Sequence, residues 1–408
     1  MTAFPSTFAE IAKVIISRLS GLSSRVDFVC DTYRHPSIKD IERTSRSAVV
    51  GGFIVSGRDQ RRPKEFHKAL RSESFKTSFL VFLSEEWARN EYAPFLNDRC
   101  LYFGLEDKCY RFTSDQETVS RIEIGDLACK HEEADTRIIW HLHHIAQHTE
   151  DSQNVVIRCS DTDVLVILLN YAGKYSLNVW MDVRLSSSNN RRYIEVNKLG
   201  SVLGQSICDA LPAVHAFTGC DYTAACVCKG KVRPFSLVEK STLFQKEFAA
   251  LGESQEVTPE TESTIESFVC AMYGKPGLCD VESVRYSIFR TKFAPTDEAQ
   301  PLGKIKGADA TLLPPSKPVK HQKLLRTNLV SYIWRHAHKA VPLELDPTEN
   351  GWLEDDGYFK LKWFSGPQLP TDIERVLSES VDEPDDTDEV ELEIDDIDGD
   401  DEDCSNTD

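Results

Sequence analysis

No segment of the 408-residue sequence is long and apolar enough for a transmembrane helix, which needs roughly 20 consecutive apolar residues. The N-terminal region also lacks a secretory pattern, because its apolar stretch at 12–16 is short and is interrupted by a lysine. The 12 cysteines include no CxxC pair, and several lie within apolar runs. This distribution indicates reduced, partly buried thiols in an intracellular protein of the nucleus or cytoplasm.

Two common catalytic signatures are missing as well. The sequence has no glycine-rich loop of the kind that holds nucleotide phosphates, and it has no recognisable Ser/His/Asp arrangement for nucleophilic catalysis. These absences leave acidic residues as the main candidates for chemistry.

Basic residues are absent from residues 376–408. That segment holds 17 of the 66 acidic residues, and the remaining 49 nearly balance the 47 lysines and arginines. The formal net charge of −19 therefore belongs mainly to this tail, and the rest of the chain is close to neutral. Because the tail has few apolar residues, we expect it to be disordered. It is either a solvated appendage or a segment that docks a protein partner or mimics DNA.

Short apolar segments alternate with segments of helical periodicity. Strands are expected near 26–30, 100–103, 110–112, 154–159 and 177–182, and helices near 7–19, 77–94, 134–145, 199–211 and 324–340. Residues 163–169 fit a helix, or by pattern alone a strand. This order indicates an α/β fold, with a parallel sheet flanked by helices. We expect a main domain at 1–295, a linker at 296–322, a helical and aromatic segment at 323–375, and the tail.

Acidic residues recur near the ends of these apolar segments, at Asp31, Glu133, Asp135, Asp161, Asp163 and Asp221. Ligand sites of parallel sheets lie at the carboxyl ends of the strands, so we expect the acids to converge. Converging carboxylates suit Mg²⁺ or Mn²⁺, and phosphodiesterases use pairs of such ions about 4 Å apart. For each acid taken singly, the alternative is a helix cap or a solvated turn residue.

The order of these motifs resembles the flap endonuclease superfamily (structure-specific 5′ nucleases with a PIN-like fold). That family has an Asp after an apolar strand, a basic stretch, a Glu-Ala-Glu-type motif, Asp-x-Asp and Gly-x-Asp-Tyr. The counterparts here are Asp31, the Glu-Ala-Asp at 133–135, the Asp-x-Asp at 161–163 and the Gly-Cys-Asp-Tyr at 219–222. The segments 131–137, 160–166 and 215–221 are similar to an animal subgroup with links to mobile elements. The resemblance covers about residues 5–295.

The resemblance implies a PIN-like sheet, two Mg²⁺ or Mn²⁺ ions, and hydrolysis of phosphodiesters in branched or free-ended DNA. It makes the six acids metal ligands or residues that support the ligands. Lys39, with Arg43 or Arg46, falls where the family contacts the scissile phosphate, although an ordinary solvated helix is the alternative. The basic region 58–76 corresponds to the family's arch over DNA, or else is a flexible surface loop.

Two features depart from the family pattern. The family's first metal-binding Asp lies on a strand before the first helix, and residues 1–6 have no room for it, so we expect a truncated N-terminus with one ligand missing. The family also grips the duplex backbone through a glycine-rich helical hairpin, whereas the segment 226–231 offers one glycine. Lys229, Gly230 and Lys231 are the candidates for that contact.

Two other readings of the acidic motifs remain open. A catalytically impaired nucleic-acid-binding or scaffold protein could retain the same fold. RNase H-like transposases also use acidic triads, but the close pairs of acids followed by Gly-x-Asp-Tyr favour the nuclease reading.

Three histidines, His141, His144 and His148, share one side of the helix expected from Ala134. The last two have the i, i+4 spacing of a zinc-binding pair. No third ligand is evident from the sequence, and the alternative is a polar flank of the helix.

Overall fold

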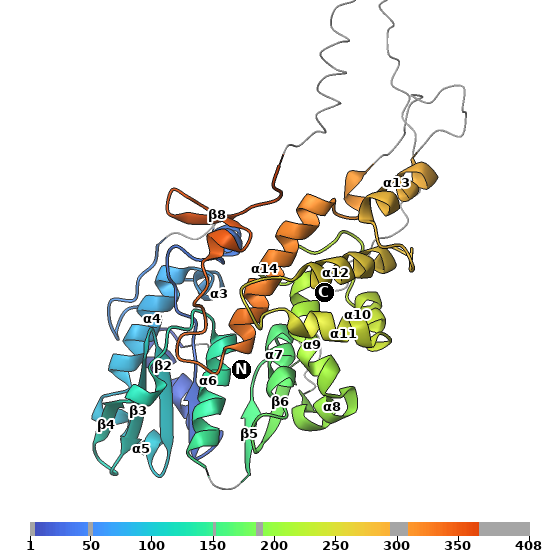
Figure 1. The fold of residues 1–408 in the computed structure, drawn as a ribbon. Coiled ribbons are helices and arrows are strands. Elements are labelled where there is room, and N and C mark those ends of the chain that lie inside the picture. The colour runs from blue at the N-terminus through green and yellow to red at the C-terminus, as the bar shows by residue number, and fades with distance from the viewer. Residues whose placement is uncertain (1–4, 48–51, 150–151, 185–190, 294–308, 367–408) are drawn as a thin grey trace, which may run out of the picture.

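The computed structural model describes residues 5–47, 52–149, 152–184, 191–293 and 309–366 (Figure 1). The acidic tail at 376–408 and the first part of the predicted linker lie outside the described residues. The described residues form a mixed α/β fold, as predicted.

The N-terminal part packs helices against a four-stranded sheet. A capping box starts the first helix: Thr7 accepts a hydrogen bond from the backbone of Glu10, whose side chain bonds back to the cap. Phe8, Phe75 and Phe103 lie in the apolar core beneath the sheet. The elements are α1 (Phe8–Ser20), β1 (Arg25–Phe28), α2 (Asp40–Ser47), α3 (Phe66–Ala69), α4 (Glu73–Glu86), η1 (Asn90–Tyr92), α5 (Ala93–Leu96), β2 (Cys100–Leu105), β3 (Lys108–Ser114), β4 (Val119–Glu123) and η2 (Gly125–Leu127).

The central part contains a second sheet and the helices that carry most of the acidic motifs. Its elements are α6 (Ala134–Gln147), β5 (Gln153–Ile157), α7 (Thr162–Tyr171), β6 (Leu177–Arg184) and β7 (Arg191–Glu195). The chain passes from β5 through α7 to β6, and the two strands pair in parallel with Val155 opposite Val179. Residues 163–169 are therefore helical, which resolves the ambiguity of their pattern.

The C-terminal part is mainly helical. The helix expected at 199–211 is two helices, because Gly204 adopts a positive φ of 83° between them. The elements are α8 (Val196–Leu203), α9 (Gln205–Thr218), α10 (Val232–Glu239), α11 (Thr242–Ala250), α12 (Pro259–Met272), α13 (Val281–Lys292), η3 (Ala310–Leu312), α14 (Lys317–Arg335), η4 (Pro347–Glu349), β8 (Trp352–Asp355) and β9 (Tyr358–Leu361).

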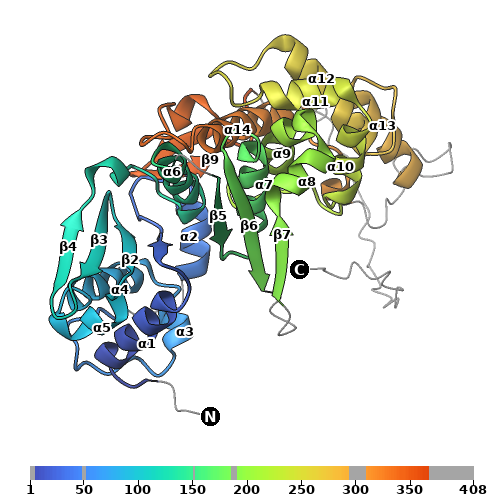
Figure 2. The same cartoon turned by 90° about the horizontal axis from the view of Figure 1, so that it is seen from below.

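The prediction of one parallel sheet is wrong for the described residues. Their strands form three small sheets with the orders β1-β2-β3-β4, β5-β6-β7 and β8-β9, and only the pairs β1/β2 and β5/β6 are parallel. Short connections join β2 to β3, β3 to β4 and β6 to β7, and a short connection permits antiparallel pairing only. Figure 2 shows the sheets of β2 and of β6 on opposite sides of α2 and α6.

The helix α14 lies in the interior rather than at the periphery (Figures 1 and 2). Its Leu324 belongs to the apolar core of the C-terminal helices, whereas Leu329 and Trp334 belong to the core shared by α6, α7 and β6. The predicted linker boundary at 322/323 falls within this helix. None of the described helices combines the length and the apolar composition needed to cross a membrane.

Candidate functional site

The site is built where the end of β1 meets the start of α6. Asp31 accepts a hydrogen bond of 2.9 Å from the backbone N–H of Ala134, the first residue of α6. The backbone N–H of Thr32 donates to the carbonyl of Glu132 at 2.7 Å. The free N–H groups and the dipole of a helix N-terminus favour carboxylates at this position. Asp31 and Glu133 are therefore held at the same helix end.

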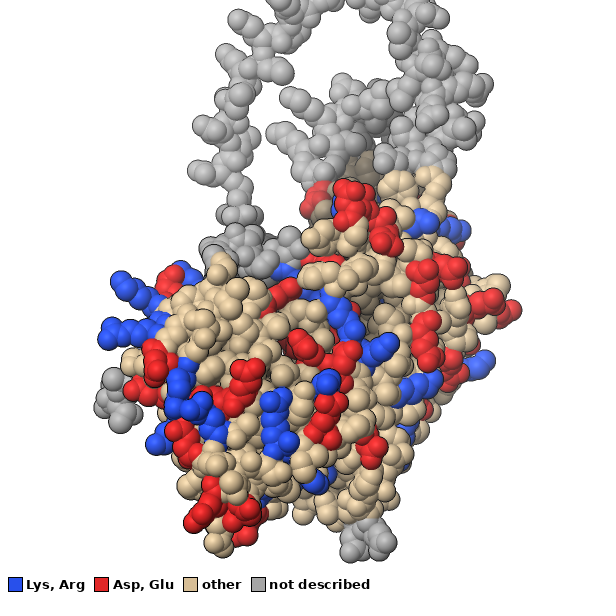
Figure 3. All heavy atoms as spheres, turned by 90° about the vertical axis from the view of Figure 1, so that its left-hand side faces the viewer, with Lys and Arg blue, Asp and Glu red and all other residues tan. Residues whose placement is uncertain are grey.

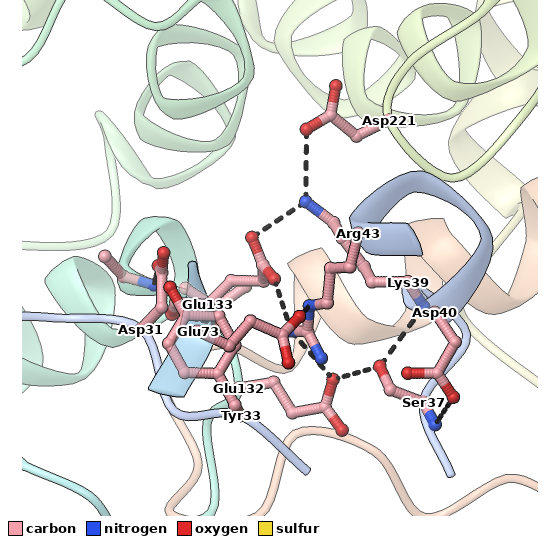
Figure 4. A network of polar contacts seen from close by, with 12 residues as sticks. Asp31, Tyr33, Ser37, Lys39, Asp40, Arg43, Glu73, Glu132, Glu133 and Asp221 are labelled. Carbon is pink, nitrogen blue, oxygen red and sulfur yellow. Dashed lines mark hydrogen bonds and ion pairs between the residues drawn. The ribbon is translucent and has the colours of Figure 1, made fainter. Parts of the chain in front are cut away.

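Lys39 lies between two of the predicted acids (Figure 4). Its Nζ is 2.7 Å from an oxygen of Glu133 and 3.2 Å from an oxygen of Asp221, and its side chain is only 6% exposed. Burial would lower the pKa of Lys39, but Glu133 and Asp221 outweigh burial and raise it. The ammonium group therefore stays charged and holds together acids that lie far apart in the sequence.

Arg43 supports the same cluster from α2. Its guanidinium is 3.1 Å from Glu133 and 3.6 Å from Glu132, and Ser37 donates a hydrogen bond of 2.6 Å to Glu132. Two of the predicted phosphate-contacting bases, Lys39 and Arg43, therefore pair with Glu133. They neutralise this acid and do not face solvent. Arg46 also lies on α2, but its side chain is outside the described part of the chain.

Asp135 carries the charge that is least compensated in this cluster. Burial raises its pKa to about 7, with further repulsion from Glu133, Asp161 and Asp31 and only partial relief from Lys39. Asp161 caps α7 by accepting a hydrogen bond of 2.9 Å from the backbone of Asp163, so the simple alternative of a helix cap holds for this residue.

Asp163 pairs with a histidine. Nε2 of His215, on α9, is 2.7 Å from Oδ1 of Asp163, and Nζ of Lys231 is 3.0 Å from Nδ1 of the same ring. Burial would raise the pKa of Asp163, but the contact with His215 outweighs burial and lowers it. The arrangement favours the tautomer in which Nε2–H donates to Asp163 and Nδ1 accepts from Lys231.

A glycine turn brings Asp221 to the cluster. Gly219 ends α9 with a φ of 116°, and a Cβ at this position would lie 2.7 Å from the Cβ of Ala225. The turn then closes through reciprocal backbone hydrogen bonds of 3.1 Å between Cys220 and Thr223. The side chain of Tyr222 turns inward, and the Nζ of Lys39 lies 4.5 Å from the centre of its ring.

The predicted backbone-binding residues are divided between two places. Lys231 contacts His215 at the edge of the acidic cluster, whereas the Nζ of Lys229 lies 4.6 Å from the ring centre of Tyr273. Gly230 is exposed and has open space where a Cβ would lie. In the basic region 58–76, Arg58 is paired with Glu86 on α4, which ties that part of the region to the protein body.

The predicted metal site at the acidic cluster can be compared with the positions of its acids. Asp31, Glu133, Asp135 and Asp161 carry the oxygen atoms that Mg²⁺ or Mn²⁺ prefers. However, the group of three potential ligand atoms that the described residues place within 4.8 Å of one another is not among these acids. Glu133 and Asp221 pair with Lys39, and Asp163 pairs with His215, so an ion would have to compete with these partners. The two-ion centre with six acidic ligands stays a prediction.

Sequence reasoning missed several members of the site. The candidates named from the sequence do not include His215, which pairs with Asp163, or Glu132, which accepts a hydrogen bond from Ser37. Each lies within a motif already recognised, at 215–221 and at 131–137. The motifs themselves were the signal, but the pairing of His215 with Asp163 joins α9 to α7 and has no local signature.

Comparison with known proteins gives no match: no protein-family model, no curated protein and no solved structure is similar to this chain. The resemblance to flap endonucleases therefore stays a prediction from the sequence motifs.

Proposed function

We propose that this protein is a divalent-metal-dependent hydrolase of nucleic-acid phosphodiesters. The observation that carries the proposal is the convergence of acids from distant segments around Lys39, Arg43 and His215. The pKa of Asp135, which burial and the neighbouring acids raise to about 7, adds support, because acids with perturbed pKa values cluster at functional sites.

The residues divide into two groups in this proposal. Asp31, Glu133, Asp135 and Asp161 hold a Mg²⁺ or Mn²⁺ ion, which when bound supplies Lewis-acid stabilisation of the phosphate and activation of water. Lys39 and Arg43 orient Glu133 and add positive charge beside the scissile phosphate. His215 orients Asp163 through its Nε2.

The distribution of charged side chains on the surface affects how a nucleic acid could bind. On the face shown in Figure 3, lysines and arginines are interspersed with acidic residues. A continuous basic surface is typical of proteins that hold long duplexes, and this face does not have one. The face in Figure 3 therefore gives no support for binding a long duplex along it. Branched or free-ended DNA is the proposed substrate because of the resemblance of the motifs.

A second candidate is a nucleic-acid-binding or scaffold protein without catalysis. The ion pairs of Lys39 with both Glu133 and Asp221 favour it, because an acid neutralised by lysine is a weaker metal ligand. In that case the chain binds DNA, and its binding does not depend on divalent ions.

The test is cleavage of flap and single-stranded DNA in Mg²⁺ or Mn²⁺. We expect Asp135→Asn and Asp161→Asn each to lower the rate by about 10²–10³-fold, the usual cost of losing one preorganised electrostatic group. The matched control is Asp98→Asn, an exposed turn residue whose φ of 55° suits asparagine, and it should cleave normally. Cleavage that survives in both site variants contradicts the proposal, and metal-independent binding without cleavage supports the scaffold candidate.

A further inference from the structure

A second group of metal-ligating side chains lies at the other end of α6. Asp126, His144 and His148 each place one potential ligand atom so that the three atoms lie within 4.8 Å of one another. Asp126 belongs to η2, a short turn that contacts α6, and the buried Leu127 beside it anchors this turn. The structure thus supplies a third ligand for a histidine pair whose spacing already suggested zinc.

The orientation of the histidine rings is already suited to a ligand role. Nδ1 of His148 is 2.8 Å from the carbonyl oxygen of His144, so its N–H donates there and Nε2 keeps a free lone pair. Metal-binding histidines commonly use their second nitrogen in this way. The Nδ1 of His144 is buried and has no hydrogen-bond partner among the described residues. The two rings stack with their centres 4.2 Å apart.

The electrostatic surroundings also suit a cation. The histidines lie in the last turn and at the C-cap of α6, where the helix dipole favours positive charge. The nearby charge of Arg25 is offset by hydrogen bonds of 2.8 and 2.9 Å to Asp27.

We propose that Asp126, His144 and His148 form a binding site for a divalent transition metal of the Zn²⁺ class. Two imidazoles and one carboxylate are a donor set for such metals, whereas Mg²⁺ prefers oxygen ligands throughout. His144 lies nine residues after Asp135 on the same helix, which corresponds to about 13 Å, so this site is separate from the acidic one. Metal binding here fastens η2 to the end of α6 and does not depend on nuclease activity.

The experiment uses the full chain, stripped with a chelator and titrated with Co²⁺. Co²⁺ reports its ligands through visible absorption, and Zn²⁺ is then added as the competitor. We expect His148→Ala to weaken binding by at least about 100-fold, since even the loss of a supporting partner costs 10–100-fold. Asp126→Asn should weaken it by at least about 10-fold. Zn²⁺ should raise the Tm of the unaltered protein but not that of His148→Ala.

Two controls accompany the titration. His67→Ala removes an exposed imidazole on α3, so it should not change the Co²⁺ spectrum. Because Asp126 and His148 are exposed, their variants should keep the unfolding temperature of the metal-free protein. Equal Co²⁺ affinity in the unaltered protein and His148→Ala overturns the proposal, as does a thiolate charge-transfer band that His148→Ala leaves unchanged.

Discussion

At the scale of single residues, Lys39 compensates part of the negative charge of the acidic site. It is nearly buried, and it contacts acids that are 94 and 182 positions away in the sequence. A lysine in this place stabilises the carboxylates when no metal is bound, and a divalent ion would compete with it for Glu133. Under the proposed function, we expect this charge to link the free energy of unfolding to metal binding.

Replacing Lys39 by methionine tests this link. We expect Lys39→Met to lower the free energy of unfolding by about 1–3 kcal/mol in a chelator, because Glu133 keeps only Arg43 as a cationic partner. Mg²⁺ should then restore much of the loss, since it can take the place of the ammonium group. The measurement is urea unfolding with and without Mg²⁺. Lys13→Met, on the exposed face of α1, is the matched control. Its free energy of unfolding should stay near that of the unaltered protein, both with and without Mg²⁺. A Lys39→Met variant that Mg²⁺ does not stabilise argues against a cation at this cluster.

At the scale of elements, the two ends of the helices α6 and α9 position the site. The N-terminus of α6 receives Asp31, and the C-terminus of α9 turns at Gly219 to present Asp221. Both placements depend on backbone geometry at a helix end. The motifs at 133–135 and 219–222 are therefore structural junctions as well as sources of carboxylates.

The turn after α9 should tolerate no side chain at Gly219. In Gly219→Ala, the positive φ and the short contact with Ala225 should together destabilise the protein by about 1–3 kcal/mol or more. Thermal unfolding measures this destabilisation. The substitution should also break the contact between Lys39 and Asp221. Gly57→Ala is the control, because nothing lies within 4 Å of the added methyl group and its φ is not positive. Equal effects of the two substitutions contradict the assignment of this turn.

At the scale of the whole molecule, α14 connects two apolar cores. Leu324 packs with the C-terminal helices, and Leu329 packs with the central sheet and its helices. Arg326, between them, donates hydrogen bonds to the carbonyls of Gly351 and Lys362, which ties β8 and β9 to the same helix. A single rigid helix with buried contacts at both ends should make the two parts unfold together.

Truncation of either leucine tests this coupling. Leu324→Ala and Leu329→Ala each remove a fully buried side chain, and each should cost about 2–5 kcal/mol. Both variants should still unfold in one transition, with coincident changes in fluorescence and circular dichroism. Leu353→Ala, on the exposed side of β8, should cost little. Two separate transitions in either core variant show that the parts are independent.

Local interactions explain which features were predictable. The helix α1, the strand β2 and the start of α6 follow from apolar spacing and capping residues, because these signals act over a few positions. The candidate acids were likewise recognisable from short motifs. Their neighbours in space were not, since the pairs Asp163–His215 and Lys39–Asp221 join segments that are remote in sequence.

Chain composition and short-range pattern therefore account for the mixed α/β character, the helix ends and the identity of the acidic motifs. Three other features arise only when distant segments pack. They are the division into three small sheets, the interior position of α14, and the neutralisation of Glu133 by Lys39 and Arg43. The physical reason is that strand pairing and burial of charge depend on partners that no local pattern specifies.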